Sequence, residues 1–180
     1  MKIDIYNTNK KYKIIYADPP WRYDDKNCNG NCQSHYNTMN IKDICNLPIK
    51  DITDKDSVLF LWCTYPMLKE GLKVIDAWGF KYKTIGFTWI KQNKTNCFLF
   101  LGMGYYTREN AELCILATKG KPLPRVSRSV HQVILSKIRE HSRKPDETRD
   151  RIVQLFGDLP RIELFARQQV DGWDCWGNEV

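Results

Sequence analysis

The sequence predicts an α/β fold, a sandwich in which helices cover both faces of a mainly parallel sheet that includes one antiparallel hairpin. Short continuous apolar runs alternate with segments of helical spacing, which is typical of parallel strands connected by helices. Two apolar runs, residues 84–91 and 112–118, are joined by a long segment without helical spacing, so they should pair antiparallel. With 180 residues, 42% of them hydrophobic, and neither repeats nor a linker, residues 1–180 should form one domain.

The first elements follow from apolar runs and capping residues. Residues 13–17 form an apolar run that predicts a buried strand, and residues 58–62 predict another. Between them, residues 40–46 predict a short helix that Asn40 caps. The apolar side of this helix carries Ile41, Ile44 and Cys45.

A longer helix should follow the second strand. Thr64 can cap it, Pro66 lies near its first turn, and Gly79 ends it. Its apolar positions recur at helical spacing, at Leu68, Leu72, Ile75 and Trp78. The apolar run at residues 133–135 is too short to assign.

The last helix and strand lie near the end of the chain. Pro145 should open a helix, because its fixed φ suits the first turn, and Asp146 and Glu147 match the helix dipole there. Gly157 stops this helix, and residues 161–166 predict a final strand. The helix should bury Ile152, Val153, Leu155 and Phe156.

The most informative motif is Asp18, Pro19, Pro20 and Trp21, directly after the first strand. Two prolines in a row make a stiff, extended bend, because proline fixes φ and restricts the residue before it. The motif therefore presents the Asp18 carboxylate and the Pro19 carbonyl as acceptors beside the ring of Trp21. The alternative is a strand followed by a turn, with Trp21 packed in the core.

These groups fit the exocyclic amine of a nucleobase. The lone pair of an adenine amine is delocalised into the ring, so the amine is a poor nucleophile. Acceptors on its two hydrogens favour a tetrahedral nitrogen and stabilise the positive charge that develops during attack. Trp21 would stack on the base and align it with the electrophile.

The chain resembles the DPPW-type adenine-N6 methyltransferases, which use S-adenosylmethionine and include eukaryotic messenger-RNA adenosine methyltransferases and bacterial and phage relatives. The resemblance implies a Rossmann-like class I methyltransferase sandwich in permuted order, with the catalytic strand first, the cofactor strand last and a reversed end strand in the hairpin. It accounts for the lack of a GxGxxG fingerprint after the first strand. It rests on residues 17–21, 35–39, 58–64, 88–91, 141–147, 161–167, 172–174 and 176–179.

The resemblance also implies a cofactor site. Lys144 matches a lysine that reaches the cofactor carboxylate, and Asp18 can accept from the cofactor amino group. Arg167 and Asn178 match residues that bind the ribose and adenine portions, and Glu179 adjoins them. Gln169 stands where some relatives have histidine, and the segment that follows is shorter here than in the messenger-RNA enzymes.

Further residues match the substrate side of the family. Tyr36 matches a tyrosine beside the target base, and Glu112 matches an acid near it. Arg22 begins a polar, glycine-containing stretch, residues 22–35, that could close over the site. Tyr105 and Arg108 offer a stacking face and a phosphate partner. Between residues 119 and 144 basic residues recur, and among these we expect Arg125 and Arg128 to contact phosphates.

The charge, the cysteine content and the lengths of the apolar runs indicate which partners, metals and membranes the chain should bind. The net charge of +7 favours an anionic partner, which we take to be nucleic acid, with DNA favoured and RNA possible. The odd number of cysteines, 7, indicates reduced thiols in a cytoplasmic protein. Cys28 and Cys32 have no second close pair, so we expect no metal. We expect no membrane association, since no apolar run is long enough for a span and the N-terminus lacks a signal-peptide profile.

The sequence therefore predicts direct methyl transfer from S-adenosylmethionine to the adenine N6 amine in a bacterial or phage-infected cell, with site selection by loops, a homodimer partner or a heteromeric subunit. Two alternatives stay open. One is a non-catalytic nucleic-acid-binding subunit, which need not bind the cofactor. The other is a methyltransferase for a different amine or amide.

Overall fold

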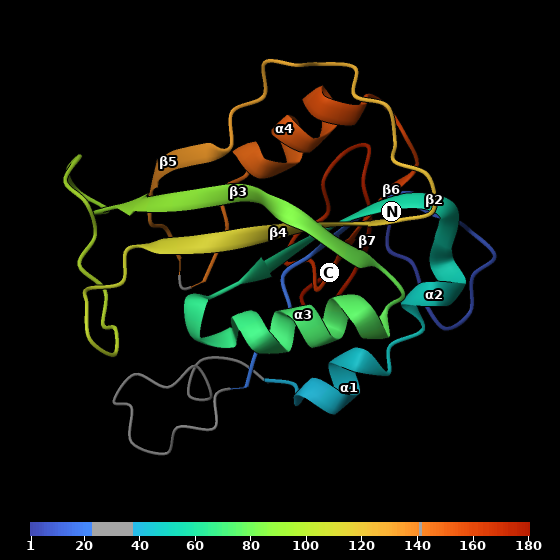
Figure 1. Cartoon of the computed structure of the whole chain (residues 1–180), viewed down its shortest axis with the longest axis horizontal. Helices are drawn as coiled ribbons and strands as arrows, with labels where there is room; N and C mark the ends of the chain where they lie inside the picture. Colours follow the sequence, from blue (N-terminus) through green and yellow to red (C-terminus); the bar gives the residue numbers. More distant parts are fainter. Residues whose placement is uncertain (23–37, 141) are drawn as a thin grey trace.

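The computed structural model describes residues 1–22, 38–140 and 142–180, which form a seven-stranded sheet of order β5-β3-β4-β2-β1-β6-β7 (Figure 1). β4 runs antiparallel to both β2 and β3, and the other neighbouring pairs are parallel. The strands are β1 (Tyr12–Ala17), β2 (Thr53–Cys63), β3 (Lys81–Gln92), β4 (Ala111–Lys119), β5 (Val133–Lys137), β6 (Arg161–Leu164) and β7 (Asp174–Trp176). The predicted fold class, including the antiparallel hairpin of β3 and β4, is confirmed.

The place of the reversed strand corrects one expectation. We expected it at the end of the sheet, but β4 lies inside, between β3 and β2. The short run at residues 133–135 is the reason, because it belongs to β5, which pairs parallel with β3 and extends the sheet beyond it.

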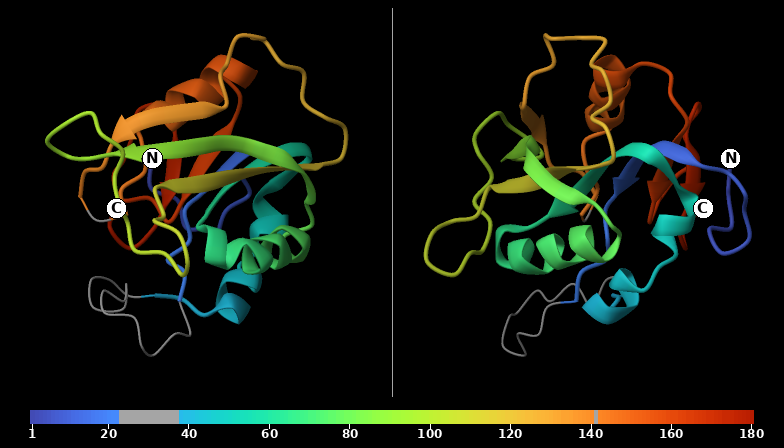
Figure 2. Two further views of the ribbon diagram at one scale, coloured as in Figure 1. Left: turned by 60° about the vertical axis from the view of Figure 1, so that its left-hand side comes forward. Right: turned by 45° about the vertical axis from the view of Figure 1, so that its right-hand side comes forward.

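Helices cover both faces of the sheet (Figures 1 and 2). On one face lie α1 (Ile41–Cys45), α2 (Ile49–Ile52), η2 (Tyr65–Met67) and α3 (Leu68–Ala77), and on the other lies α4 (Glu147–Phe156). Each face of the sheet has its own hydrophobic core, and successive residues of β1 point into opposite cores. Ile15 packs in the core on the α1 and α3 side, and Ile14 packs in the core on the α4 side. Period-two alternation in strands buried on both faces explains these continuous apolar runs.

The helix starts differ from the sequence predictions. Thr64 makes no side-chain capping bond, and η2 precedes α3. α4 begins at Glu147, two residues after Pro145, and ends at Gly157, whose φ of 78° suits glycine. Neither α2 nor β7 was predicted, because both are too short to show a period.

The sheet topology gathers the ends of four strands at one edge. Ala17, at the end of β1, pairs with Leu61 of β2 and with Leu164 of β6. Because β4 is reversed, its first residues reach the same edge, and Leu113 pairs with Cys63 at the end of β2. Residues that follow β1 and β6 and residues that begin β4 therefore meet where ligands bind in open α/β sheets.

No helix within residues 1–22, 38–140 and 142–180 combines the length and the apolar composition needed to cross a bilayer.

Candidate active site

A cavity of about 930 Å³ opens at this edge of the sheet. Its walls come from the turn after β1, the start of β4, the segment before α4 and the chain on either side of β7. In the last of these walls, the chain after β7 passes close to the chain after β6. This approach requires glycine at position 177, because a Cβ there would lie only 2.5 Å from the Ala166 carbonyl oxygen. The polar lining includes Asp18, Lys91, Glu112, Lys144, Arg167, Asn178 and Glu179.

The two prolines turn the chain sharply at the cavity. The Trp21 amide donates to the Pro19 carbonyl at 2.9 Å, and the Met39 amide donates to the Pro20 carbonyl at 2.9 Å. A carbonyl oxygen has two lone pairs, so Pro19 keeps one for a ligand. The motif therefore offers the Asp18 carboxylate and one lone pair of Pro19 as acceptors.

Trp21 lines the cavity but belongs mostly to the core. Its side chain is packed in the cluster on the α1 and α3 side, with 5% of the residue exposed. Its indole N–H donates to the Trp62 carbonyl at 3.1 Å, which fixes the ring. Trp21 thus fits the alternative of a core tryptophan more closely than that of an open stacking platform.

A chain of alternating charges crosses the floor of the cavity. Lys144 Nζ lies 2.9 Å from Asp18 Oδ1 and 3.2 Å from Glu112 Oε2. Lys91 Nζ lies 2.5 Å from the other oxygen of Glu112, Oε1. Lys144 is well shielded, with 10% of its side chain exposed. Each charge thus has an opposite neighbour, as buried charges require.

Burial and pairing set the protonation of these groups. Burial raises the pKa of Asp18 above its ordinary value, although Lys144 opposes the shift. Burial also disfavours the ionised form of Glu112, but Lys144 and Lys91 outweigh it and hold its pKa below the ordinary value. Burial alone would lower the pKa of Lys144, and the carboxylates of Asp18 and Glu112 raise it instead. Lys144 is therefore a permanent cation in the cavity.

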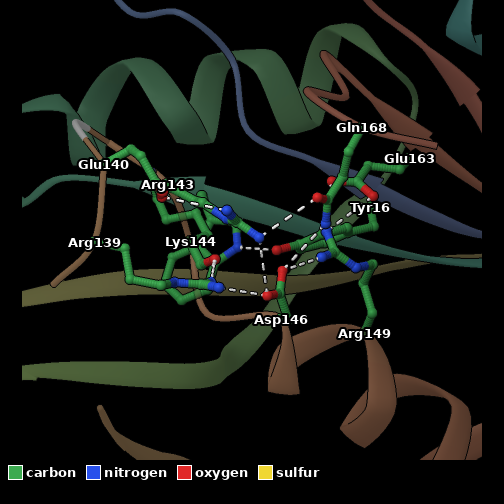
Figure 3. A network of polar contacts seen from close by, with 10 residues as sticks. Tyr16, Arg139, Glu140, Arg143, Lys144, Asp146, Arg149, Glu163 and Gln168 are labelled. Atoms are coloured by element: carbon green, nitrogen blue, oxygen red, sulfur yellow. Dashed lines mark hydrogen bonds and ion pairs between the residues drawn. The ribbon is translucent and has the colours of Figure 1, made fainter. Parts of the chain in front are cut away.

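A second network fixes the backbone around Lys144 (Figure 3). The carboxylate of Asp146 contacts the guanidinium groups of Arg139, Arg143 and Arg149. Arg139 also donates from Nη2 to the Lys144 carbonyl at 2.7 Å. The segment that carries Lys144 is thereby fastened to the first turn of α4.

A smaller cavity of about 280 Å³ adjoins the first and shares Asp18, Lys144 and Arg167 with it. Glu163 of β6 lines this smaller cavity. Nη1 of Arg149 donates to both carboxylate oxygens of Glu163, to Oε1 at 3.1 Å and to Oε2 at 3.2 Å. Burial raises the pKa of Glu163 to about 7, against the opposing effect of Arg149.

The sequence matches a known family over this whole region. The family model described as MT-A70 covers residues 12–179.

The chain belongs to the MT-A70 family.

Curated relatives agree with the family assignment. The type II methyltransferase M.MunI of a Mycoplasma species is 35% identical over 95% of this chain and 78% of its own length. The N(6)-adenosine-methyltransferase catalytic subunit METTL3 of Homo sapiens is 28% identical over 94% of this chain, which spans 28% of that subunit. An MT-A70-like N(6)-adenosine-methyltransferase of Arabidopsis thaliana is 28% identical over 99% of this chain and 25% of its own length. The expected family is confirmed, and the relatives are named as methyltransferases, two of them as N(6)-adenosine-methyltransferases.

Most sequence-predicted cofactor residues of this MT-A70 chain meet in one place. Asp18, Lys144, Arg167, Asn178 and Glu179 all line the larger cavity, where Arg167 lies 3.4 Å from Glu179. Gln169 is different, because it is exposed and lines neither cavity. Its neighbour Gln168 lines the smaller cavity and donates to Asp146 at 3.3 Å.

The predicted substrate residues divide into groups. Glu112 is in the cavity floor, and Tyr105 and Arg108 are exposed on the loop between β3 and β4, whose Phe100 and Met103 line the cavity. Arg22 is exposed directly after the motif. Tyr36, together with Cys28, Cys32 and most of the polar stretch 22–35, lies outside the described residues.

Arg125 and Arg128 lie away from the cavity. They are exposed on the segment after β4, which leaves the sheet at the opposite edge, where Lys119 pairs with Ser57. The Val126 amide donates to the Leu155 carbonyl at 2.9 Å, so this segment runs along the end of α4 that is remote from Lys144.

Sequence reasoning missed Lys91, Arg149 and Glu163. Lys91 could have been found, because it is the last residue of a stretch, residues 88–91, on which the family resemblance rests. Glu163 also carried a signal, as a single acid inside an apolar strand, where an ionisable group needs a partner. Arg149 carried none, since an arginine in the first turns of an amphipathic helix is usually solvated.

Asp146→Asn should loosen the Lys144 segment. Asp146 is 42% exposed, so we expect a loss of only about 1–2 kcal/mol in the free energy of unfolding. For a domain of this size the loss corresponds to a fall of roughly 2–8 °C in Tm, measurable by differential scanning fluorimetry. Glu147→Gln, which removes the neighbouring exposed pair with Arg151, is the control. Equal Tm values for the two variants would contradict a fastening role for Asp146.

Proposed function

We propose that the chain, acting as one domain, transfers a methyl group from S-adenosylmethionine to the N6 amine of adenine in nucleic acid, with DNA favoured over RNA. The observation that carries the proposal is the Asp18 carboxylate, held beside the Lys144 ammonium at 2.9 Å in a large cavity of an MT-A70 chain. Its proposed setting is the cytoplasm of a bacterial or phage-infected cell.

The residues of the cavity fit the cofactor. Its methionine end is a zwitterion, and the adjacent opposite charges of Lys144 and Asp18 complement a carboxylate and an ammonium. Arg167, Asn178 and Glu179 supply donors and acceptors for hydroxyl groups and ring nitrogens along the wall after β6. The volume of about 930 Å³ lies at the upper end of small-molecule sites, so it leaves room for a base as well.

The cofactor would supply an electrophilic methyl group. Asp18 and the remaining lone pair of Pro19 accept the hydrogens of the adenine amine, which localises the lone pair on nitrogen and stabilises the charge that develops. Asp18 must be ionised for this task, and Lys144 favours its ionised form. Glu112, held ionised by Lys144 and Lys91, fixes Lys144 between two carboxylates. No covalent enzyme intermediate is needed.

DNA is favoured because this chain is 35% identical to a type II methyltransferase and covers 78% of its length, whereas it is 28% identical to the METTL3 subunit and covers 28% of that subunit. RNA is the competing substrate, since that subunit is named for adenosine. Site selection would come from the loops around the cavity or from a second subunit, either another copy or a different chain.

The decisive experiment is incubation with methyl-labelled cofactor and either DNA or RNA, single- and double-stranded, followed by nucleoside mass spectrometry. We expect N6-methyldeoxyadenosine from DNA. Cofactor binding by calorimetry without any labelled nucleoside would favour another amine or amide substrate. Absence of cofactor binding would favour the non-catalytic subunit and would overturn the proposal.

Nucleic-acid binding should weaken steeply with salt, and Arg125→Ala combined with Arg128→Ala should flatten that dependence. Removing one phosphate-binding cation reduces the log–log slope by about one unit, so we expect a decrease of up to about two for the double variant. The measurement is affinity across a salt series for wild type and double variant. Lys94→Ala with Arg108→Ala, on the loop beside the cavity, is the comparison. Identical slopes for wild type and the Arg125 and Arg128 variant would leave those arginines as solvated surface.

A further inference from the structure

The loop between β3 and β4, residues 93–110, extends from the ends of these two strands (Figures 1 and 2). Several of its large apolar side chains are exposed to solvent. We call this loop the rim loop. Phe98 is 78% exposed, Leu101 69% and Tyr106 fully exposed. Leu99, Met103 and Tyr105 are exposed as well. An apolar cluster of this kind on one loop marks an interaction site.

The rim loop has a defined shape. The Asn93 amide donates to the Phe98 carbonyl at 2.9 Å, and the Gly102 amide donates to the Glu109 carbonyl at 3.0 Å. Its glycines permit the close turn, since a Cβ on Gly104 would lie 2.2 Å from the Thr107 carbonyl oxygen. The loop is therefore folded on itself, and Phe98, Leu101 and Tyr106 are exposed on it while Phe100 lines the cavity.

The rim loop is continuous with the candidate active site. Phe100 and Gly102 line the cavity that contains Asp18 and Lys144. Leu101 lies between these two lining residues and is itself exposed. A partner on the rim loop would thus sit at the mouth of the cavity.

The charge of the rim loop selects the partner. Its exposed charged residues are Lys94 and Arg108, whereas its one acid, Glu109, is half-buried and lines the cavity. A second copy docking through the same loop would bring cation against cation without an exposed carboxylate, since a two-fold interface uses the same patch on both sides and Glu109 lines the cavity. A polyanion with apolar faces, which is the chemistry of stacked nucleotides, fits both properties.

We propose that the rim loop is a wedge that enters the base stack of a duplex, with Leu101 and Tyr106 filling the space left by the adenine that turns into the cavity. The proposal rests on the nucleic-acid function proposed above. Apolar side chains inserted between base steps unstack and kink a duplex, and extrusion of a base costs a few kcal/mol. Lys94 and Arg108 would contact the flanking phosphates.

The test compares Leu101→Ser, Tyr106→Ser and the double variant on three DNA substrates. These are a duplex, the same duplex with an abasic site opposite the target adenine, and the single strand. Loss of the wedge should slow methylation of the intact duplex about tenfold or more and leave the other two rates within about twofold of wild type. A duplex with 2-aminopurine at the target should show a smaller fluorescence increase with the double variant. Val126→Ser, another exposed apolar residue, is the control.

The outcomes separate this proposal from the proposed function. If wild type methylates none of the substrates, the function fails. If wild type methylates DNA and the double variant matches it on the duplex, or is slowed equally on all three substrates, the wedge is wrong and the function stands. A wild-type dimer that the double variant converts to monomer, seen by light scattering, would assign the rim loop to a second copy and overturn the wedge.

Discussion

Asp18→Ala is expected to reduce methyl transfer by about 10- to 100-fold or more, and Asp18→Asn to retain more activity than Asp18→Ala. A charge-assisted hydrogen bond contributes about 1.5–3 kcal/mol, so its loss alone lowers the rate by roughly 10- to 100-fold. Alanine removes the acceptor, whereas asparagine keeps a neutral carbonyl oxygen. Alanine also leaves Lys144 with Glu112 as its remaining carboxylate contact.

The rate should be measured with labelled cofactor at saturating cofactor concentration, so that weaker cofactor binding does not mimic impaired chemistry. Because the ionised form of Asp18 is the active one and burial raises its pKa, wild-type activity should fall as the pH falls through that pKa. The residual rate of Asp18→Asn should lack this decline. Asp171→Ala, at an exposed turn, is the control. Wild-type activity in Asp18→Ala would refute the assignment.

The sequence predicts local features of this fold well, because each leaves a local signal. The strand that ends at Ala17 and the motif that starts at Asp18 adjoin in the chain, and Lys144 lies three residues before the start of α4 at Glu147. The meeting of Asp18, Lys144 and Glu112 in one cavity could not be predicted from such local signals. It depends on the reversal of β4 inside the sheet, which no local pattern encodes.

The differences between the predicted site residues and the residues that line the cavities also have physical causes. The backbone of Phe165 has a φ of 61°, a left-handed conformation that is rare for a non-glycine residue and turns the chain after β6. The residues after this turn do not continue the alternation of the strand, and Gln168 rather than Gln169 lines the smaller cavity. The pair of Arg149 and Glu163 joins a helix to a strand, so neither residue predicts the other from spacing.

Lys144→Met is expected to destabilise the fold and to weaken cofactor binding. Methionine keeps most of the side-chain volume, so the change removes mainly the charge. Asp18 and Glu112 would then face each other without their shared cation, and breaking a buried ion pair costs about 3–5 kcal/mol. That corresponds to a decrease of roughly 10 °C in Tm. Loss of the ammonium should also lower cofactor affinity about 10- to 100-fold in calorimetry.

The pH dependence distinguishes this explanation from a simple packing defect. In wild type, Lys144 favours the ionised form of both carboxyl groups. Without it, burial and mutual repulsion raise their pKa values above those of the unfolded chain, so the folded variant takes up protons more readily than the unfolded one. Its stability deficit should therefore be largest above pH 7 and shrink as the pH falls towards 5. Lys144→Arg, which keeps a cation, should recover much of the Tm. The matched control is Lys73→Met, at a lysine whose side chain is 57% exposed. If Lys144→Met lost no more stability than Lys73→Met, or if its loss of stability did not change with pH, the ion cluster would not stabilise the site.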